Sequence, residues 1–273
     1  MTNKALSFSV ITPSYQQGQY IRQNIESVLI QGWPTVEHIV VDGGSRDETV
    51  TILKSYPHLN WVSEKDEGQA DALNKGLSLA TGDIVGWINS DDYYNEDVFN
   101  SVAACFADPA VQWVIGDLSL LEESSGAFIP LKSPEVSFES LQKNPDIVRQ
   151  QATFFRRELL QRTGGWNKSF FMAMDFDIWI RLSKLSKPLM LQKQLAVFRI
   201  QKDQKSSLAN LQRQSTELQL VLNREGASAI NIFRLKLKKD WFWLKGTIKV
   251  ILVKMGLLNS KYLHKPYRGW QKT

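Results

Sequence analysis

The sequence predicts an α/β protein with a mostly parallel central sheet flanked by helices, followed by a basic, helical C-terminal extension. Short β-branched runs alternate with helical stretches through the first 90 residues, and acidic or hydroxyl side chains follow these runs. A chain of 273 residues with 43% hydrophobic content is long enough to bury a complete core. In such sheets, ligands bind beyond the carboxyl ends of the strands.

The periodicity assigns each element in turn. In the first half we expect strands at residues 8–12, 36–42, 59–63 and 83–88, and helices at 20–31, 47–55 and 69–80. Ser45 is expected to cap the second of these helices. In the second half we expect a helix at 95–107, a strand at 111–116, a hairpin-like stretch to 131, a strand at 151–155, helices at 157–163 and 175–185, an extended stretch at 189–200 and a helix at 208–224.

Cysteine content and the length of the apolar runs indicate the cellular compartment of the protein. The chain contains one cysteine, Cys105, which excludes an intrachain disulfide and a cysteine cluster for zinc, and fits a reducing compartment. The apolar runs fall short of the roughly 18 residues of a membrane span, and the first residues lack the pattern of a signal peptide. The sequence therefore predicts a cytoplasmic protein.

Positive charge is concentrated at the C-terminus. Residues 230–273 contain eleven Lys or Arg against one acid, Asp240, a balance of +10 in a chain of net charge +5, so the rest of the chain is acidic. The same stretch contains Trp241, Phe242 and Trp243. Two interpretations stay open: a segment lying peripherally on an anionic membrane surface, or a helix packing its Trp and Leu face onto the body of the protein. Because that body is acidic, no nucleic acid partner is expected.

Polar side chains gather where the predicted strands of the first half end. In chain order they are Ser14 and Tyr15, Asp42, Asp66, and Asp91 with Asp92. Because the carboxyl ends of parallel strands share one edge of the sheet, these side chains are expected to line a common crevice.

The stretch INSDDYY at residues 88–94 predicts a divalent cation site. The adjacent carboxylates of Asp91 and Asp92 raise each other's pKa unless a cation compensates their charge. Carboxylate and phosphate oxygens suit Mg²⁺ or Mn²⁺. The alternative is that this acid pair caps the helix that begins near Asn95.

Two further stretches contain candidate residues. In FMAMDFDIWIRL, residues 171–182, Asp175 or Asp177 could accept a proton from an attacking hydroxyl. Two residues that are two positions apart on a helix point in different directions, so one of them is expected to face the site. In EKDEGQADALNKG, residues 64–76, the helix N-terminus and Lys75 could hold a phosphate. The alternatives are helix capping for the first stretch and a solvated helix start for the second.

Six stretches in order carry a family resemblance: SVITPSYQQGQYI, HIVVDGGSRDET, WVSEKDEGQADALNKGLSLATGD, WINSDD, QQATFFRRELLQRTGGWNKSF and MDFDIWIRL. Over residues 7–206 the chain resembles glycosyltransferase family 2. The resemblance implies a Rossmann-like GT-A catalytic domain at 1–206, with a nucleotide-binding half at 1–95 and an acceptor half at 96–206, and leaves 207–273 as the extension. It also implies inverting transfer from a nucleotide-diphosphate sugar to a saccharide or lipid-linked saccharide, with Mn²⁺ or Mg²⁺, in cell-surface polysaccharide or glycolipid synthesis.

The resemblance also implies roles for individual residues. Asp42 matches the acid that hydrogen-bonds the base, Asp91 and Asp92 match the metal motif, and Asp175 matches the general base. The other residues that it places at the nucleotide sugar are Thr12, Pro13, Ser14, Tyr15, Asp66, Asp71, Asn74, Lys75, Asn89 and Ser90.

Three positions depart from the family pattern. Asn89 replaces the leading acid of the metal motif, Leu73 stands where many relatives have Arg, and Gln201 stands where a His often occurs. One alternative is therefore a catalytically silent relative that binds sugar nucleotides. A sugar nucleotidyltransferase is the other, although its Gly-rich phosphate loop is absent here.

Overall fold

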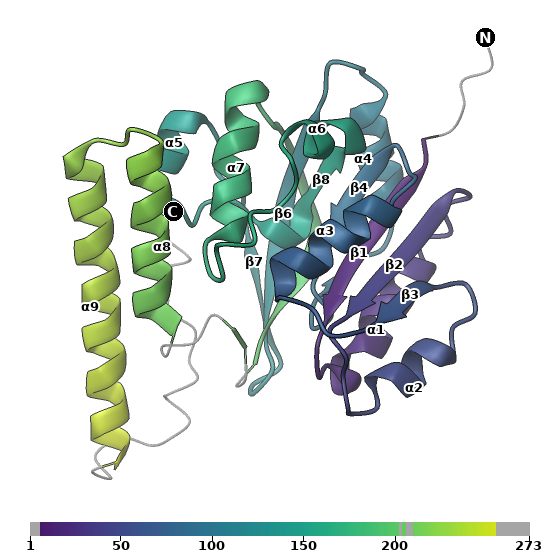
Figure 1. Ribbon diagram of the computed structural model, residues 1–273, viewed down its shortest axis with the longest axis horizontal. Helices are drawn as coiled ribbons and strands as arrows, with labels where there is room; N and C mark the ends of the chain where they lie inside the picture. Colours follow the sequence, from purple (N-terminus) through teal and green to yellow (C-terminus); the bar gives the residue numbers. More distant parts are fainter. Residues whose placement is uncertain (1–5, 202–203, 206–209, 255–273) are drawn as a thin grey trace.

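The computed structural model describes residues 6–201, 204–205 and 210–254 (Figure 1). The strands are β1 (Phe8–Ser14), β2 (Val36–Asp42), β3 (Asn60–Ser63), β4 (Ile84–Trp87), β5 (Tyr93–Tyr94), β6 (Trp113–Glu122), β7 (Ala127–Leu131), β8 (Thr153–Arg156) and β9 (Leu189–Ile200). The helices are α1 (Gly18–Leu29), α2 (Thr49–Lys54), α3 (Gln69–Leu79), α4 (Val98–Phe106), α5 (Phe138–Lys143), the 3-10 helix η1 (Gln150–Ala152), α6 (Arg157–Arg162), α7 (Met174–Leu185), α8 (Leu211–Arg224) and α9 (Ala229–Lys254).

The first half of the chain forms the parallel sheet that the alternation predicts. Among the described residues the sheet has nine strands in the order β3-β2-β1-β4-β8-β6-β9-β5, with β7 paired to β6. Strands β1 to β4 are mutually parallel, and their register places Ser14, Asp42 and Ser63 in one row at the carboxyl edge. One local expectation is wrong: α2 begins after Glu48, and the Ser45 hydroxyl donates to Asp42 instead of capping the helix.

The second half of the sheet is mixed. Strand β8 runs antiparallel to both β4 and β6, while β9 is parallel to β6. Since β8 runs opposite to β4, the residues just before β8, in η1, lie at the carboxyl edge of β4. The end of β9 reaches the same edge, because β9 has the direction of β4.

Helices cover both faces of the sheet (Figure 1). The buried residues of α1, α2 and α4 pack on one face, and those of α3, α6 and α7 pack on the other. Helix α7 is fixed by Trp179, whose ring stacks on Trp87, Trp113 and Phe155 with centroid separations of 5.6 to 6.4 Å. Aromatic rings bury large apolar areas, so this stack sets the position of α7 on the sheet.

The two C-terminal helices lie side by side, with α8 against the body and α9 outside it (Figure 1). Leu218, Val221 and Leu222 of α8 and Leu235 of α9 belong to the same core cluster as α7. Residues 255–273 and the side chains of Phe242 and Trp243 lie outside the described part of the chain. Within the described part, no helix combines the length and apolarity needed to cross a bilayer.

Buried His38 gives the fold a pH dependence. His38 lies in β2 with its Nε2 2.9 Å from the Thr12 hydroxyl, and burial lowers its pKa to about 3 from an ordinary 6.5. Because the folded pKa is the lower one, its contribution to stability is complete above pH 6.5 and is lost as the pH falls toward 3. We expect the free energy of unfolding to fall by about 1.4 kcal/mol per pH unit below about pH 6.

Urea denaturation between pH 7 and pH 5 measures this effect. His38→Gln is expected to flatten the dependence, whereas His58→Gln, at an exposed position, is expected to retain it. An unchanged slope in His38→Gln would assign the effect to other groups.

Candidate functional site

The turn at residues 89–92 follows β4 and is held by Asn24 of α1. The Asn24 amide donates to the backbone oxygens of Asn89 and Asp92, at 2.9 Å each, and the Thr12 hydroxyl donates to the Asn24 side-chain oxygen. The backbone N–H of Asp92 closes the turn on the Asn89 carbonyl. Since β1 and α1 both hold the turn, its two acids point in fixed directions.

Asp92 points into the protein. Its side chain is 1% exposed and accepts hydrogen bonds from the Arg199 backbone N–H at 2.9 Å, from Gln151 Nε2 at 2.9 Å and from Asn89 Nδ2 at 3.4 Å. Burial raises the pKa of Asp92, and the neighbouring charge of Asp91 raises it further. These donors compensate the burial of the carboxylate, so Asp92 joins parts of the sheet together.

Asp91 is the partly exposed member of the pair. Gln201 Nε2 donates to Asp91 Oδ2 at 2.9 Å, and Arg199 Nε donates to the Asp91 backbone carbonyl at 3.1 Å. Burial raises the pKa of the Asp91 carboxyl, and the Arg199 charge opposes that rise. Gln201 therefore contacts the same carboxylate from the position where relatives have His.

These contacts decide which acid fits a divalent cation. No cluster of three or more His, Cys, Asp or Glu side chains that could hold a metal occurs among the residues described. Mg²⁺ in phosphate-transfer sites needs only one or two protein carboxylates, because phosphate oxygens and water complete its shell. Asp91 fits that requirement. Asp92 fits it less well, because protein donors already occupy its carboxylate, and metal binding by the acids of this motif stays a prediction.

Asn89 and Ser90 of the same turn make internal contacts. Asn89 Oδ1 accepts from Gln69 Nε2 at 2.7 Å and from Trp87 Nε1 at 3.0 Å, while Asn89 Nδ2 donates to Gln150 Oε1 at 3.1 Å. Ser90 is buried. Both residues were predicted at the nucleotide sugar, and in this structure their side chains support the turn that presents Asp91.

Asp42 organises the next loop. It is completely buried, and it accepts hydrogen bonds from the backbone N–H groups of Gly44 and Ser45 and from the hydroxyls of Ser45 and Ser63. Four donors thus surround the buried Asp42 carboxylate, and its hydrogen bond to a base stays a prediction.

Tyr15, which is exposed, and Asp66, which is half-buried, lie beside that loop. Tyr15 is 61% exposed, whereas Thr12, Pro13 and Ser14 before it are buried. A Cβ atom placed on Gly43 would lie 3.0 Å from Asp66 Oδ2 and 3.3 Å from the Tyr15 ring. The absence of a side chain at Gly43 thus lets a ring and a carboxylate close in around one small space at the sheet edge.

The predicted residues of α3 make mainly structural contacts. Asn74 donates to the Trp166 carbonyl at 2.7 Å and accepts from the Trp166 N–H at 2.8 Å, which ties α3 to the turn after α6. Asp71 lies between Lys75, at 3.5 Å, and Lys168, at 3.3 Å. These contacts hold α3 in place. They favour a structural role for Asn74 and Asp71 over contact with a phosphate.

Asp175 and Asp177 point in different directions, as their spacing predicts. Asp177 is completely buried and pairs with Arg181 at 2.7 Å and with Arg224 at 2.6 Å. Asp175 is partly exposed and accepts from the Phe176 N–H at 2.7 Å. Burial raises the pKa of Asp175, which makes its carboxylate a stronger base.

Polar contacts link Lys205, whose charge acts on the nearby Asp175 carboxyl, to the turn that carries Asp91. Lys205 Nζ donates to Gln69 Oε1 at 2.9 Å, and Gln69 Nε2 in turn donates to Asn89. Burial lowers the pKa of Lys205 to about 8, while the nearby Asp175 charge opposes that change. Asp91 and Asp175, which come from different halves of the chain, are therefore brought to one edge of the sheet.

Several residues of this edge were missed by the sequence reasoning. They are Gln69, Gln150, Gln151, Arg199 and Lys205. Gln150 and Gln151 precede β8, whose antiparallel direction the strand pattern does not reveal. The position of Arg199 at the end of the extended stretch 189–200 was the one available signal, because every other strand end had supplied a site residue.

Glu217 of α8 caps the helix that carries Asp175. Its Oε2 accepts from the backbone N–H groups of Met172 at 2.6 Å and Ala173 at 3.0 Å, just before α7. The N-cap residue Ala173 has no side chain able to do this. Because free N–H groups at a helix start need acceptors, Glu217 fixes the first turn of α7.

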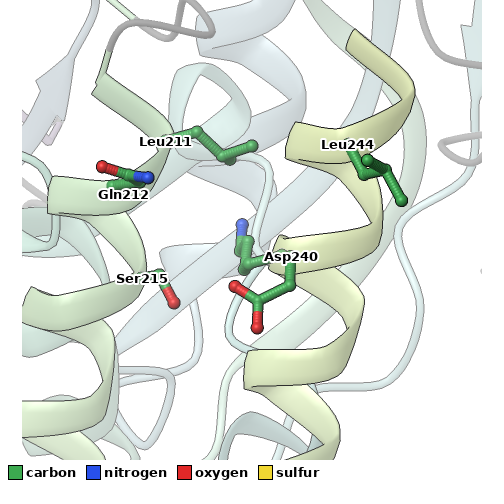
Figure 2. Close-up of a pocket in the computed structure, with 6 residues that line it drawn as sticks. Leu211, Gln212, Ser215, Asp240 and Leu244 are labelled. Atoms are coloured by element: carbon green, nitrogen blue, oxygen red, sulfur yellow. The ribbon is translucent and has the colours of Figure 1, made fainter. Parts of the chain in front are cut away.

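A cavity of about 330 Å³ lies elsewhere, between α8 and α9 (Figure 2). Its lining residues are Leu211, Gln212, Ser215, Lys239, Asp240 and Leu244. None of the predicted site residues is among them, so this cavity is separate from the edge that carries Asp91 and Asp175.

Comparison with known proteins finds sequence similarity to glycosyltransferases. The family model of Glycosyl transferase family 2 matches residues 9–173. The uncharacterized glycosyltransferase Rv1514c of Mycobacterium tuberculosis is 30% identical over 203 residues, which are 71% of this chain and 75% of that protein. Chondroitin synthase of Escherichia coli is 26% identical over 183 residues, which are 65% of this chain and 26% of that protein.

Solved structures confirm the fold. S. aureus TarS 1–349 in complex with UDP-GlcNAc gives a TM-score of 0.63 at 22% identity and covers 79% of this chain and 65% of its own. The mannosyltransferase PcManGT from Pyrobaculum calidifontis in complex with GDP-Man and Mn²⁺ gives 0.60 at 20% identity and covers 98% of this chain and 84% of its own. The GT-A fold is thereby confirmed, and the family match over more than half of the chain shows that it belongs to glycosyltransferase family 2.

Proposed function

We propose that this protein is an inverting, metal-dependent glycosyltransferase that moves a sugar from a nucleotide-diphosphate sugar to an acceptor hydroxyl. The observation that carries the proposal is the pair of contacts from Lys205 to Gln69 and from Gln69 to Asn89. They link the surroundings of Asp175, a candidate base, to the turn with Asp91, an acid for a cation. A related chondroitin synthase supports a role in polysaccharide or glycolipid synthesis. UDP-GlcNAc and GDP-Man with Mn²⁺ in similar folds support the donor class.

The nucleotide-sugar donor would bind along the carboxyl edge of the parallel strands. The base would lie against the Tyr15 ring, which is 61% exposed. Asp91 would hold Mn²⁺ or Mg²⁺, which offsets the negative charge that develops on the diphosphate when the glycosidic bond breaks. Gln201 and Arg199 fix Asp91 in place for this task.

The acceptor side uses Asp175. As the acceptor hydroxyl attacks the anomeric carbon, its proton passes to the Asp175 carboxylate. Attack from the face opposite the leaving diphosphate inverts the configuration in one displacement. Burial raises the Asp175 pKa, and the Lys205 charge opposes that rise and so favours the ionised carboxylate.

A catalytically silent sugar-nucleotide binder is the second candidate, because Asn89 and Gln201 depart from the family pattern. The structure favours the enzyme, since both residues support Asp91 and neither displaces it. The nucleotidyltransferase alternative gains nothing from the family match.

Substitution of Asp175 tests the proposed base. Asp175→Asn removes the proton acceptor, so we expect transfer to fall by about 10² to 10⁴ while donor binding is retained. Initial rates with a nucleotide-sugar panel measure the first quantity, and donor titration measures the second. Asp108→Asn, an exposed carboxylate away from the site, serves as the control. Unimpaired turnover in Asp175→Asn would remove this residue from the mechanism.

Substitution of the adjacent acids separates their roles. Asp91→Asn is expected to leave the melting temperature unchanged and to abolish the extra stabilisation that a donor sugar nucleotide gives in the presence of Mn²⁺. Asp92→Asn weakens three buried hydrogen bonds, so we expect it to lower the free energy of unfolding by about 1.5 to 3 kcal/mol. Thermal unfolding with and without metal and donor measures both the stability of each variant and its stabilisation by the ligands. The assignment is wrong if the two variants exchange these behaviours.

Glu217 is expected to act as a positioning residue. Glu217→Ala frees two N–H groups before α7, so kcat should fall about tenfold at an unchanged donor KM. Glu217→Gln, which keeps an acceptor oxygen, should recover part of that loss. Arg213→Ala is the matched control, because Arg213 touches the other Glu217 oxygen at 2.8 Å. Equal kcat values for Glu217→Ala and Arg213→Ala would mean that the cap has no effect on the site.

A further inference from the structure

Helix α9 has an exposed apolar stripe on the part of its surface that the structure describes. Ile230, Phe233, Leu237, Trp241 and Leu244 follow one another at intervals of three or four residues and are between 44% and 62% exposed. Side chains with this spacing share one face of a helix. A contiguous exposed surface of five large apolar side chains is typical of an interaction site.

The opposite face of α9 fixes which side points outward. Leu235 is buried in the core cluster shared with α7 and α8. Lys239 is also buried, and its Nζ donates to Asp146 Oδ2 and to Gln214 Oε1, at 3.0 Å each. The helix therefore cannot turn its stripe inward without breaking a buried ion pair. The face with Leu235 packs on the protein, whereas Leu237 and Trp241 are exposed, and the membrane interpretation stays a prediction.

Cations border the free face. Arg234, Lys236 and Lys245 are exposed, whereas the ammonium of Lys238 is directed to Asp146, at 3.8 Å, on the body of the protein. Asp240 is the one acid on the helix. Lys245 Nζ lies 4.7 Å from the centre of the Trp241 ring, so a positive charge sits directly on the stripe. The surface thus combines apolar side chains with positive charge.

This charge pattern decides between two occupants. A second copy of the chain, paired stripe to stripe, would bring the bordering cations of both helices against each other, and like charges at such positions oppose pairing. An anionic bilayer satisfies both parts of the surface, because apolar and Trp side chains enter the headgroup region while Lys and Arg contact lipid phosphates.

The stripe extends toward the end of the molecule that carries the site. Helix α9 runs alongside α8 in the opposite direction (Figure 1). Leu244 lines the same cavity as Leu211 at the start of α8 (Figure 2). Asn210, just before α8, donates to the Lys205 carbonyl at 2.9 Å, and Lys205 in turn contacts Gln69 at the site. The C-terminal part of the stripe therefore lies at the end of the fold where β9 delivers its residues to the site.

We propose that α9 lays this stripe on an anionic membrane surface, so that the enzyme works on a lipid-linked acceptor held in that membrane. The acceptor class rests on the proposed glycosyltransferase function, whereas the docking surface does not.

Vesicle cosedimentation of the full chain tests the docking surface without donor or acceptor. We expect binding to vesicles of equal parts phosphatidylcholine and phosphatidylglycerol, and weaker binding to phosphatidylcholine alone. The triple variant Phe233→Ser, Leu237→Ser, Trp241→Ser should reduce the partition coefficient by at least about tenfold. Lys236→Gln with Lys245→Gln should weaken the preference for anionic lipid measurably. Phe128→Ser with Leu220→Ser, at exposed apolar positions outside α9, should bind as the native chain does.

All substituted side chains are exposed, so the variants should keep the native melting temperature, which serves as the folding check. Equal sedimentation of the native chain and the triple variant would overturn the proposal. A concentration-dependent dimer that the triple variant abolishes would also overturn it in favour of a second copy. Native binding to vesicles without any sugar transfer would uphold the surface and refute only the proposed function.

Discussion

The buried carboxylate of Asp92 is the constraint on which the site depends. A buried charge is tolerated only when hydrogen-bond donors surround it. The donors here come from three distant segments: the turn after β4, η1 before β8, and the end of β9. Their convergence fixes how the first and second halves of the sheet meet. Asp91 is adjacent in sequence, so the same constraint turns its carboxylate outward.

This constraint also gives a physical reason for two departures from the family pattern. Asn89 donates to Asp92 and Gln150 while accepting from Gln69 and Trp87, which requires an amide that has both donors and an acceptor. An acid at this position would place a third carboxylate beside Asp91 and Asp92. Gln201 donates to Asp91, which holds that carboxylate in place. Both departures are consistent with an edge that still presents one acid for a cation.

The helix with the proposed base depends on segments beyond the family match, which ends at residue 173. Trp179 anchors α7 on the sheet, and Glu217 of α8 supplies the acceptor for the N–H groups before its first turn. Helix α9 in turn packs on α8 and leaves an apolar, basic face outside. The C-terminal helices therefore serve the site on one side and offer a docking surface on the other.

The sequence alone determined the alternation of strands and helices in the first half, the gathering of acids at strand ends and the opposite directions of Asp175 and Asp177, because local periodicity and spacing encode these features. Tertiary structure decided which acid of the pair faces outward, that Asp42 is buried, and that Gln151 and Arg199 reach the turn. These outcomes depend on the direction and neighbours of β8 and β9, which are set by pairing between residues far apart in the chain. Local sequence patterns do not specify such pairing.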